Sequence, residues 1–186
     1  MPLLALSDIP LPLHFIPGEY RLSHAATAWE RADCHRLRRQ IFCEEQKIFT
    51  TDDRDAIDDV CIHLAAWSCM FGHTDEIVGT VRIHEPSPGL WWGSRLAVAR
   101  PFRRIGGLGP ALIRLAVGTA RAAGAQSFLA HVQAQNRALF ESLNWQTLDE
   151  KTIHGRPHLL MQADLAAYEP ISGTALRVLP ALSTAR

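Results

Sequence analysis

The chain has 186 residues, 47% of them hydrophobic and 20% charged, which fits one globular domain with a sizeable core and excludes a disordered chain. Lysine plus arginine and aspartate plus glutamate both number 19, so no basic excess suggests a nucleic-acid partner. No apolar run reaches the roughly 18 residues of a membrane span, and the four cysteines form no CxxC pair. We therefore expect a cytoplasmic protein with reduced cysteines and no membrane partner.

The first half of the chain predicts a strand, a helix and three further strands. Residues 1–18 are apolar but interrupted by prolines and lack a basic start, so we expect an N-terminal extension rather than a signal peptide. A strand is expected at 19–25, followed by a helical pattern over 26–46. An acidic, turn-forming loop follows at 50–59, where a solvated loop is the plainest interpretation of each acid. Apolar strands joined by turns are then expected at 61–71, 76–85 and 90–98.

The second half predicts a helix, a strand, a short helix and a hairpin. Proline is favoured at the first helical position and glycine is a natural stop, which predicts a helix over 110–123. Residues 127–133 have the pattern of a buried strand, and Asn136 can cap the short helix after it. A final hairpin is expected over 145–165, turning near His154-Gly155.

The tail after Tyr168 contains two more prolines and is expected to be a loosely held extension. The predicted organisation is therefore an extension at 1–18, a domain at 19–168 and a tail at 169–186. Strands and helices mix around one sheet, which is typical of an α+β fold.

The stretch RRIGGLGPAL, residues 103–112, places two arginines and three glycines before the predicted helix. A helix N-terminus presents unpaired N–H groups and a partial positive charge, and glycines let the backbone approach a phosphate closely. The spacing of Arg104, Gly107 and Gly109 matches neither a Walker loop nor the GxGxxG dinucleotide fingerprint. By itself the run fits either a tight turn or an anion site.

The segment RLAVARPFRRIGGLGPALIRLAVGTARAAGAQSFLAHVQAQNRALFESLNW resembles the acetyl-CoA-binding core of the GNAT superfamily of N-acetyltransferases. The flanking strands and the final hairpin extend this resemblance to residues 19–165. It implies an α+β fold in which a mixed, mostly antiparallel central sheet, flanked by helices, splays between its fourth and fifth strands. It also implies acetyl-CoA as co-substrate of an acyltransferase.

The resemblance implies roles for individual residues. The main chain of Leu96 and Val98 would pair with the pantetheine arm, and the N–H of Val98 would polarise the thioester carbonyl as an oxyanion-hole donor. Asn136 and Phe140 would lie beside the pantetheine and its sulfur. The cofactor-binding residues implied in this way are Leu96, Ala97, Val98, Arg103, Arg104, Ile105, Gly106, Gly107, Leu108, Gly109, Asn136 and Phe140.

Acetyl transfer to an amine needs a base for the ammonium proton and benefits from an acid for the leaving thiolate. Many family members carry a tyrosine acid where this chain has Phe140, and some carry a glutamate base on the fourth strand, which here has no carboxylate. The candidate replacements are Glu45 as base, and His158. Glu45 lies in RRQIFCEEQ and His158 in GRPHLLM, and both stretches resemble ElaA-type acetyltransferases.

The acceptor pocket is expected at the end of the sheet that the first helix and the final hairpin close. Arg82 and His84 point to the same side of their strand, so both are candidate substrate-binding residues. Arg82 would pair either with a substrate carboxylate or with an acid of the 50–59 loop. No two histidines show a metal spacing with a third ligand, so we expect no metal. The pocket is predicted to be bordered by Glu44, Glu45, Asp55, Asp58, Arg82 and His158.

Three functions fit these observations. The first is an acetyl-CoA-dependent N-acetyltransferase acting on a small polar amine. The second is a catalytically weak CoA-binding regulatory module, because both usual acid and base positions are empty. The third is an enzyme similar to acyl-homoserine-lactone synthases, which the RRQIFCEEQ segment also resembles. The chain also resembles a GNAT subgroup found near nitrilase genes, and this resemblance implies a role in nitrogen metabolism. A homodimer is allowed, because Trp91-Trp92 fits either the core or an interface.

Overall fold

The structure, a computed structural model, describes residues 17–70, 72–103, 107–173 and 176–179. Residues 1–16 of the predicted N-terminal extension lie outside this part, as do Arg104, Ile105 and Gly106 of the glycine run. The helices are α1 (Ala28–Arg39), the π-helical turn η2 (Gln40–Glu45), η3 (Ala56–Asp59), η4 (Arg100–Phe102), α2 (Leu108–Ala122), η5 (Ala134–Asn136), α3 (Arg137–Glu141) and η6 (Leu165–Ala167). The strands are β1 (Tyr20–His24), β2 (Ile62–Met70), β3 (His73–Ser87), β4 (Leu90–Val98), β5 (Ser127–Gln133), β6 (Trp145–Ile153), β7 (Arg156–Ala163) and β8 (Leu176–Val178).

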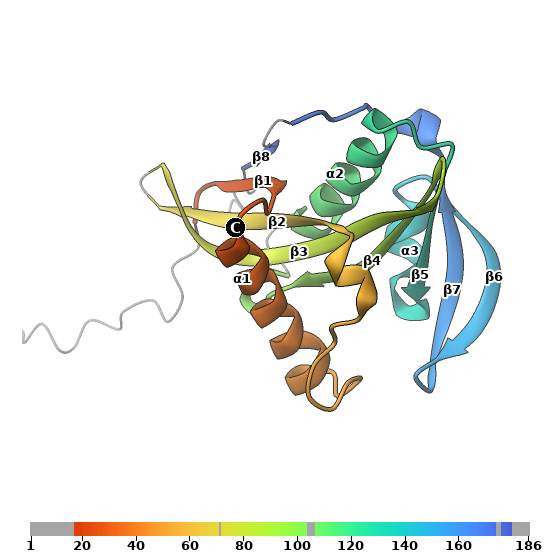
Figure 1. Ribbon diagram of the computed structural model, residues 1–186, viewed down its shortest axis with the longest axis horizontal. Helices are drawn as coiled ribbons and strands as arrows, with labels where there is room; N and C mark the ends of the chain where they lie inside the picture. Colours follow the sequence, from red (N-terminus) through yellow and green to blue (C-terminus); the bar gives the residue numbers. More distant parts are fainter. Residues whose placement is uncertain (1–16, 71, 104–106, 174–175, 180–186) are drawn as a thin grey trace, which may run out of the picture.

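All eight strands form one sheet in the order β6-β7-β5-β4-β3-β2-β1-β8 (Figure 1). Every neighbouring pair in it is antiparallel except β4 and β5, which are parallel. The α+β fold with a mixed, mostly antiparallel sheet is therefore confirmed. The parallel pair requires a crossover, and α2 provides it.

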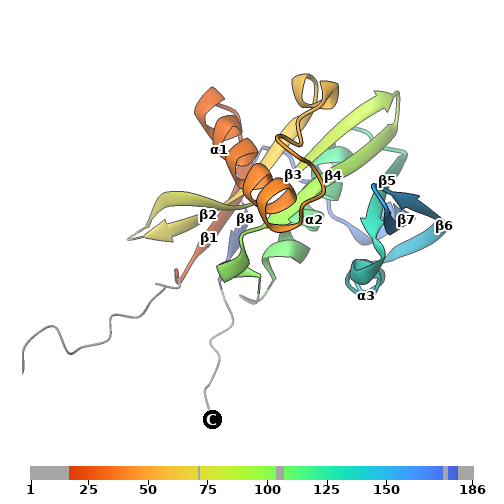
Figure 2. The same cartoon turned by 90° about the horizontal axis from the view of Figure 1, so that it is seen from below.

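Helices cover both faces of the sheet. In Figure 2, α1 and the η3 segment lie on one side, and α2 and α3 lie on the other. The apolar face of α2 forms the centre of the main core, where Leu112 and Val117 have no exposed surface. Trp91 lies in this core with 6% of its surface exposed, whereas the neighbouring Trp92 is half-buried and contacts His131.

The sheet splays between β4 and β5. Their pairing begins at Leu90 and Ser127 and ends at Gly93 and Ala130, so the last five residues of β4 have no partner in β5. A β-bulge lies at the same place: the register of β4 against β3 gains one residue after Ser94. Arg95 absorbs it with a φ of 56°, a left-handed conformation that increases local twist. The bulge bends β4 away from β5 and opens the predicted gap.

The first helical segment differs from its prediction as a single helix over 26–46. It begins at a capping box in which Thr27 and Glu30 exchange hydrogen bonds, and it remains α-helical only to Arg39. The next six residues form a π-helical turn, with the N–H of Gln46 bonded to the carbonyl of Ile41. Such turns are often found at functional sites.

Three other local expectations need correction. Pro110 is the third residue of α2 rather than the first, because the helix begins at Leu108 after Gly107; its missing N–H still falls in the unpaired first turn. Asn136 precedes α3, but its side chain makes no capping hydrogen bond. The tail is not wholly loose: β8 pairs antiparallel with β1. The turn at His154-Gly155 is confirmed, and both residues have positive φ, as a two-residue hairpin requires.

Candidate acyl-transfer site

The open end of β4 directs backbone groups into the splay. The N–H of Ala99 donates to the carbonyl of Val78 at 2.8 Å, so these two residues form a hydrogen-bonded pair between β3 and its neighbour. In an antiparallel ladder such pairs alternate with pairs whose polar groups point outward. Val98 lies opposite Gly79 in the outward class. Its N–H is therefore directed toward the gap left by β5, as an oxyanion-hole donor must be.

The N-terminus of α2 lies just beyond the end of β4. Gly107 is the N-cap, with a φ of 99° that favours glycine, and its carbonyl accepts the first helical bond from Ala111 at 2.8 Å. The N–H groups of Leu108 and Gly109 belong to the unpaired first turn and carry the positive end of the helix dipole. Among the described residues, no atom outside the helix and the adjacent chain lies within 4 Å of a Cβ built at Gly107 or Gly109, so they leave space for a ligand at this end of the helix.

Arg103 joins the end of β4 to the π-helical turn. Its Nε donates to the carbonyl of Val98 at 2.8 Å, and its two terminal nitrogens contact the carboxylate of Glu45 at 2.5 and 2.8 Å. Both side chains are 36% exposed. The hydrogen bond from Arg103 lowers the pKa of Glu45 against a smaller opposing effect of burial, so the carboxylate stays ionised at neutral pH. Glu45 is thereby held close to the end of the splay.

The next residue, Gln46, reaches the other side of the splay. Its side-chain oxygen accepts from Nε2 of Gln133, the last residue of β5, at 3.1 Å, and its carbonyl accepts from Arg156 of β7 at 2.6 Å. The π-helical turn is therefore linked to β4 by the ion pair of Glu45 with Arg103, and the residue after the turn, Gln46, contacts β5. This arrangement bridges the two sides of the gap at one place.

A family model described as "Acetyltransferase (GNAT) family" matches residues 28–145 of the chain, which includes α1, the splay and α3. The chain belongs to the GNAT family. It is accordingly an acyltransferase whose co-substrate is an acyl-CoA.

A curated relative and several solved structures are similar to the chain. The relative is the uncharacterized protein YyaT of Bacillus subtilis, 27% identical over 144 residues that cover 73% of this chain and 91% of YyaT. A proposed N-acetyltransferase from Lactobacillus plantarum has a TM-score of 0.70 at 20% identity, covering 78% of this chain and 98% of its own. Escherichia coli ElaA has a TM-score of 0.65 at 19% identity, with the same two coverages.

The fold is also shared with BjaI, a CoA-dependent acyl-homoserine lactone synthase solved with SAM and isopentyl-CoA. It has a TM-score of 0.61 at 18% identity, covering 77% of this chain and 82% of BjaI. At these identities the solved structures support the GNAT fold alone. No helix in the described part of the chain is long and apolar enough to cross a membrane.

In this GNAT chain two acids of the 50–59 segment, Asp53 and Asp58, have buried side chains, whereas Asp52 and Asp59 are exposed, as a solvated loop predicts. Asp53 and Asp58 have side chains that are 0% and 2% exposed, and both bind Arg38 of α1, at 2.8 and 2.5 Å. Arg82 of β3 contacts Asp58 at 2.7 Å and both oxygens of Asp55 at 2.7 Å. The sequence alternative in which Arg82 pairs with an acid of this loop is therefore the one observed. A substrate carboxylate could reach Arg82 only by displacing one of these aspartates.

The ion pairs with Arg38 and Arg82 lower the pKa values of Asp55 and Asp58. Burial alone would raise the pKa of Asp58, but hydrogen bonds and the charge of Arg38 outweigh burial and hold it well below its usual range. The hydrogen bond from Arg82 lowers the pKa of Asp55. Both carboxylates are therefore ionised at neutral pH and engaged with arginines.

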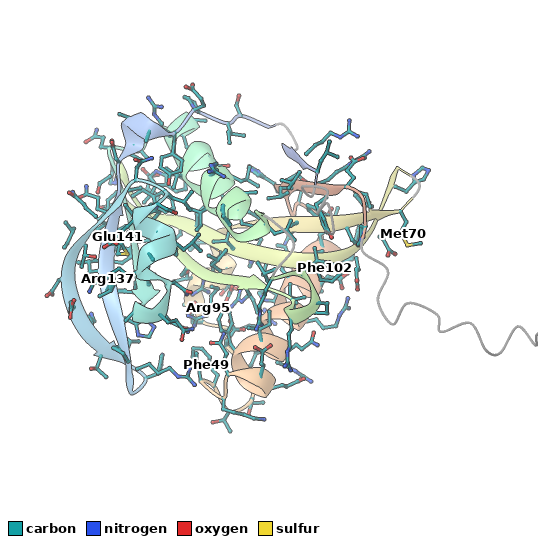
Figure 3. The ribbon with its side chains drawn as sticks, turned by 180° about the vertical axis from the view of Figure 1, so that it is seen from behind. Phe49, Met70, Arg95, Phe102, Arg137 and Glu141 are labelled. Carbon is teal, nitrogen blue, oxygen red and sulfur yellow. The ribbon has the colours of Figure 1, made fainter. Side chains whose placement is uncertain are left out.

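Arg95, at the bulge of β4, links this cluster to the entrance of the splay. It contacts Asp53 at 2.9 Å, and its guanidinium lies 4.7 Å from the ring centre of Phe49. Figure 3 shows Arg95 and Phe49 side by side. The ring of Phe49 also contacts the ring of His154, from the β6–β7 turn, with the two ring centres 5.0 Å apart. An arginine, a phenylalanine and a histidine therefore line this rim of the sheet.

The two candidate histidines lie on different strands. His158 in β7 is half-buried, and its Nδ1 lies 2.9 Å from the carbonyl of Arg156. Because a carbonyl only accepts, Nδ1 carries the proton of this bond and Nε2 remains an acceptor when the ring is neutral. His84 in β3 is half-buried beside Trp92, and its Nδ1 is buried without a partner among the described residues.

The remaining residues of the expected cofactor site occupy two environments. Phe140 is 6% exposed and meets Trp145 edge-on at 5.0 Å, so its ring belongs to the core whatever else it contacts. Ala97 is 4% exposed and packs with Leu37, Ile41 and Phe42. Leu96 is partly buried against the main core. Glu44, expected beside the acceptor, is exposed and contacts Arg39 at 3.4 Å.

Sequence reasoning missed several residues of this region. Arg38 is the first residue of the RRQIFCEEQ segment that resembles ElaA-type acetyltransferases, but its buried pairing with Asp53 depends on the fold. The bulge at Arg95 has no glycine to signal its positive φ. The fold also brings His35, Asp58 and His63 together, although their spacing in sequence does not indicate a metal site.

Proposed function

We propose that the chain is an acetyl-CoA-dependent N-acetyltransferase that acts on a small polar amine by direct attack on the thioester. The observation that carries this proposal is the pairing of two groups at one end of the splay. The N–H of Val98 is directed into the gap, and the carboxylate of Glu45 is bound to the arginine that also contacts the Val98 carbonyl. One group suits a developing oxyanion and the other suits an ammonium proton.

The residues at the splay fit a CoA thioester. Leu96 and Val98 lie on the unpaired end of β4, where an extended pantetheine arm would add as a strand. The open N-terminus of α2 at Gly107 and Gly109, together with Arg103, suits a pyrophosphate. Asn136 and Phe140 would flank the arm from η5 and α3. Acetyl-CoA, when bound, supplies an acetyl group activated as a thioester, which the amine attacks with loss of the thiol.

The amine must lose a proton before it attacks. With a pKa near 10.4, only about one primary amine in a thousand is neutral at pH 7.4. Glu45 is the proposed base, directly or through water, because the π-helical turn holds it beside the end of β4. Nε2 of His158 is the second candidate, since its other nitrogen is engaged with a carbonyl.

The acceptor is proposed to enter between the 46–55 segment and the β6–β7 hairpin. Gln46 bonded to Gln133 limits the space at this end, which favours a small substrate. The rim of Arg95, Phe49 and His154 suits a polar molecule with a carboxylate or a planar group. Arg82 and His84 would then border the floor of the pocket from β3. Arg82 would not contact the substrate directly but would hold Asp55 and Asp58 in place.

The test is a screen of amines and amino acids for acetylated product by mass spectrometry, with acetyl-CoA as donor. For the best substrate, Glu45→Gln should reduce kcat by about 10²-fold or more, because a general base is lost. Glu44→Gln is the matched control, since Glu44 is the exposed neighbour and contacts only Arg39 among the partners described. Equal rates in both variants would move the base to His158, which His158→Gln would then reveal. An enzyme that acetylates no amine would contradict the proposal.

A second candidate function follows from the fold shared with BjaI. The same screen should include longer acyl-CoA donors and SAM as acceptor. Release of CoA only with these two together would favour a synthase of acyl-homoserine lactones. Binding of CoA without turnover on any acceptor would favour the regulatory module.

A further inference from the structure

The ion pairs of Arg38, Arg82 and Arg95 with Asp53, Asp55 and Asp58, here called the ion-pair cluster, adjoin a second polar cluster that shares Asp58. His35 comes from α1, Asp58 from η3 and His63 from the start of β2. One potential ligand atom of each lies within 4.8 Å of the others. Nε2 of His63 is 3.9 Å from Oδ1 of Asp58, and the two imidazole rings meet edge-on at 5.0 Å. Three different elements therefore contribute to one small cluster.

A fourth donor adjoins the cluster. Sγ of Cys61 lies 3.3 Å from Nε2 of His63. In a tetrahedral zinc site with ordinary bond lengths, neighbouring sulfur and nitrogen ligands are about 3.5 Å apart, and nitrogen and oxygen ligands about 3.3 Å apart. The distances of Cys61 and Asp58 from His63 are within about 0.6 Å of these values. Small side-chain rotations would therefore bring the donors to a metal.

The histidines are in the protonation state that a metal needs. Burial, with the nearby charge of Arg38, lowers the pKa of His63 to about 4 and also lowers that of His35. Both rings are therefore neutral near pH 7. Nδ1 of each ring is buried without a hydrogen-bond partner among the described residues. An unsatisfied buried nitrogen is unfavourable, and ligation would relieve this at any ring nitrogen that binds the ion.

The charge around the cluster permits a cation. The three arginines Arg38, Arg82 and Arg95 are balanced by Asp53, Asp55 and Asp58, so the ion-pair cluster is neutral as a whole. Arg38 and Arg82 also hold the carboxylate of Asp58 in place, which orients its Oδ1 toward His63. The nearby guanidinium of Arg38 opposes a dication, so moderate rather than extreme affinity is expected.

We propose that His35, Asp58 and His63, with Cys61 as the fourth ligand, form a zinc-binding site. Two imidazoles, one carboxylate and one thiol are a donor set that zinc prefers. Zinc would displace the thiol proton of Cys61 to solvent, leaving a thiolate ligand. Four protein ligands complete the coordination, so the role is structural: the ion would fix α1 and η3 to the start of β2. This site is separate from the splay and does not depend on the acetyltransferase assignment.

The experiment uses the full chain, treated with a chelator and titrated with Co²⁺ and with Zn²⁺. Co²⁺ in a tetrahedral site with a thiolate gives intense visible bands and a near-ultraviolet charge-transfer band, while calorimetry gives the Zn²⁺ stoichiometry. His35→Gln is the main variant, because His35 is only half-buried on the surface of α1 and its loss should not prevent folding. His73→Gln, an exposed histidine in β3, is the matched control. Cys61→Ser tests the fourth ligand.

One equivalent of Zn²⁺ should bind the wild type and His73→Gln equally. In His35→Gln the affinity should fall on the order of 100-fold, because one ligand bond is lost. Cys61→Ser should still bind Co²⁺ but lose the charge-transfer band. Equal affinity of the wild type and His35→Gln, an octahedral Co²⁺ spectrum, or equal weakening in His73→Gln would each overturn the proposal.

Discussion

Arg103 binds both carboxylate oxygens of Glu45, at 2.5 and 2.8 Å, while its Nε donates to the carbonyl of Val98 at 2.8 Å. One side chain thus joins the proposed base, the proposed oxyanion-hole strand and the loop that leads to the N-terminus of α2. The guanidinium cannot pair fully with Glu45 and with a phosphate at the same time. If Arg103 binds a CoA phosphate as proposed, this binding competes with the pairing of Arg103 and Glu45.

This competition predicts opposite effects for the two partners of one ion pair. Arg103→Gln should weaken CoA binding by roughly 10- to 100-fold, because a charge-assisted hydrogen bond is lost. Glu45→Gln should leave CoA affinity unchanged or improve it, because Arg103 is then released. Isothermal calorimetry with CoA measures both. Equal weakening in the two variants would mean that the pair only supports the loop.

The N-terminus of α2 can be tested without disturbing its geometry. A Cβ at Gly109 meets none of the described residues within 4 Å, and an anion in the first turn of a helix favours folding. Gly109→Glu should therefore fold normally but bind CoA at least tenfold more weakly, because the carboxylate repels the pyrophosphate. Gly109→Gln, of equal size and no charge, should lose much less affinity. Similar CoA affinities for the two variants would place the pyrophosphate elsewhere.

The ion-pair cluster under α1 gives a sharp contrast between neighbouring residues. Arg38 is 0% exposed and bound to Asp53 and Asp58, whereas Arg39 is exposed. Arg38→Ala should destabilise the fold by about 3–5 kcal/mol, because two buried carboxylates lose a partner. Arg39→Ala should change stability by less than about 0.5 kcal/mol. Urea unfolding measures both; a small effect for Arg38→Ala would mean that water replaces the guanidinium.

The order of the elements followed from hydrophobic periodicity and turn residues. The hairpin turn at His154-Gly155 and the stop at Gly124 are examples in which local chemistry determines local structure. The splay was predicted from the resemblance to the GNAT family. The register of β4 shows its physical origin, which is the bulge at Arg95. An arginine with a φ of 56° has no signal in the sequence, because the surrounding sheet imposes it.

The acids of the 50–59 segment show why the site was harder to predict. Their composition is that of a solvated loop, and only the three-dimensional meeting of Arg38, Arg82 and Arg95 makes burial of Asp53 and Asp58 favourable. These arginines come from α1, β3 and β4, which are far apart in sequence. Periodicity places each on a face of its own element but does not pair the faces. The π-helical turn could not be predicted either, because the hydrophobic periodicity of residues 26–46 does not distinguish it from the α-helix that it continues.

The buried His63 predicts a loss of stability in mild acid. Its pKa is near 6.5 in the unfolded chain and about 4 in the fold, where it faces His35, Arg38, Asp58 and Cys61. A depressed pKa contributes stability above the unfolded value that is lost as pH falls toward the folded value. Between pH 7 and pH 5 the metal-free protein should therefore lose about 2 kcal/mol through this group.

Urea unfolding at the two pH values measures the loss. His35 adds to it in the same direction, since burial also lowers its pKa. Asp55 and Asp58 do not contribute in this range, because their depressed pKa values matter only below about pH 4. His73→Gln, at an exposed position, should behave as the wild type does. Stability that is constant from pH 7 to pH 5 would show that His63 reaches solvent.

Substitutions of the two glycines of α2, Gly109 and Gly118, test whether residues 169–171 pack against this helix. The carbonyl of Gly118 accepts from the N–H of Ile171 at 2.9 Å, and a Cβ at Gly118 would lie 2.6 Å from Ile171 Cδ1 and 2.8 Å from the carbonyl of Glu169. Helix propensity alone favours alanine over glycine by about 1 kcal/mol. Gly118→Ala should nevertheless destabilise the protein by about 1–3 kcal/mol, because the backbone of Glu169 must move. Gly109→Ala, where the space is open, should be neutral or stabilising, and thermal unfolding compares the two. If both substitutions stabilise the protein equally, the 169–171 segment does not pack against α2 in solution.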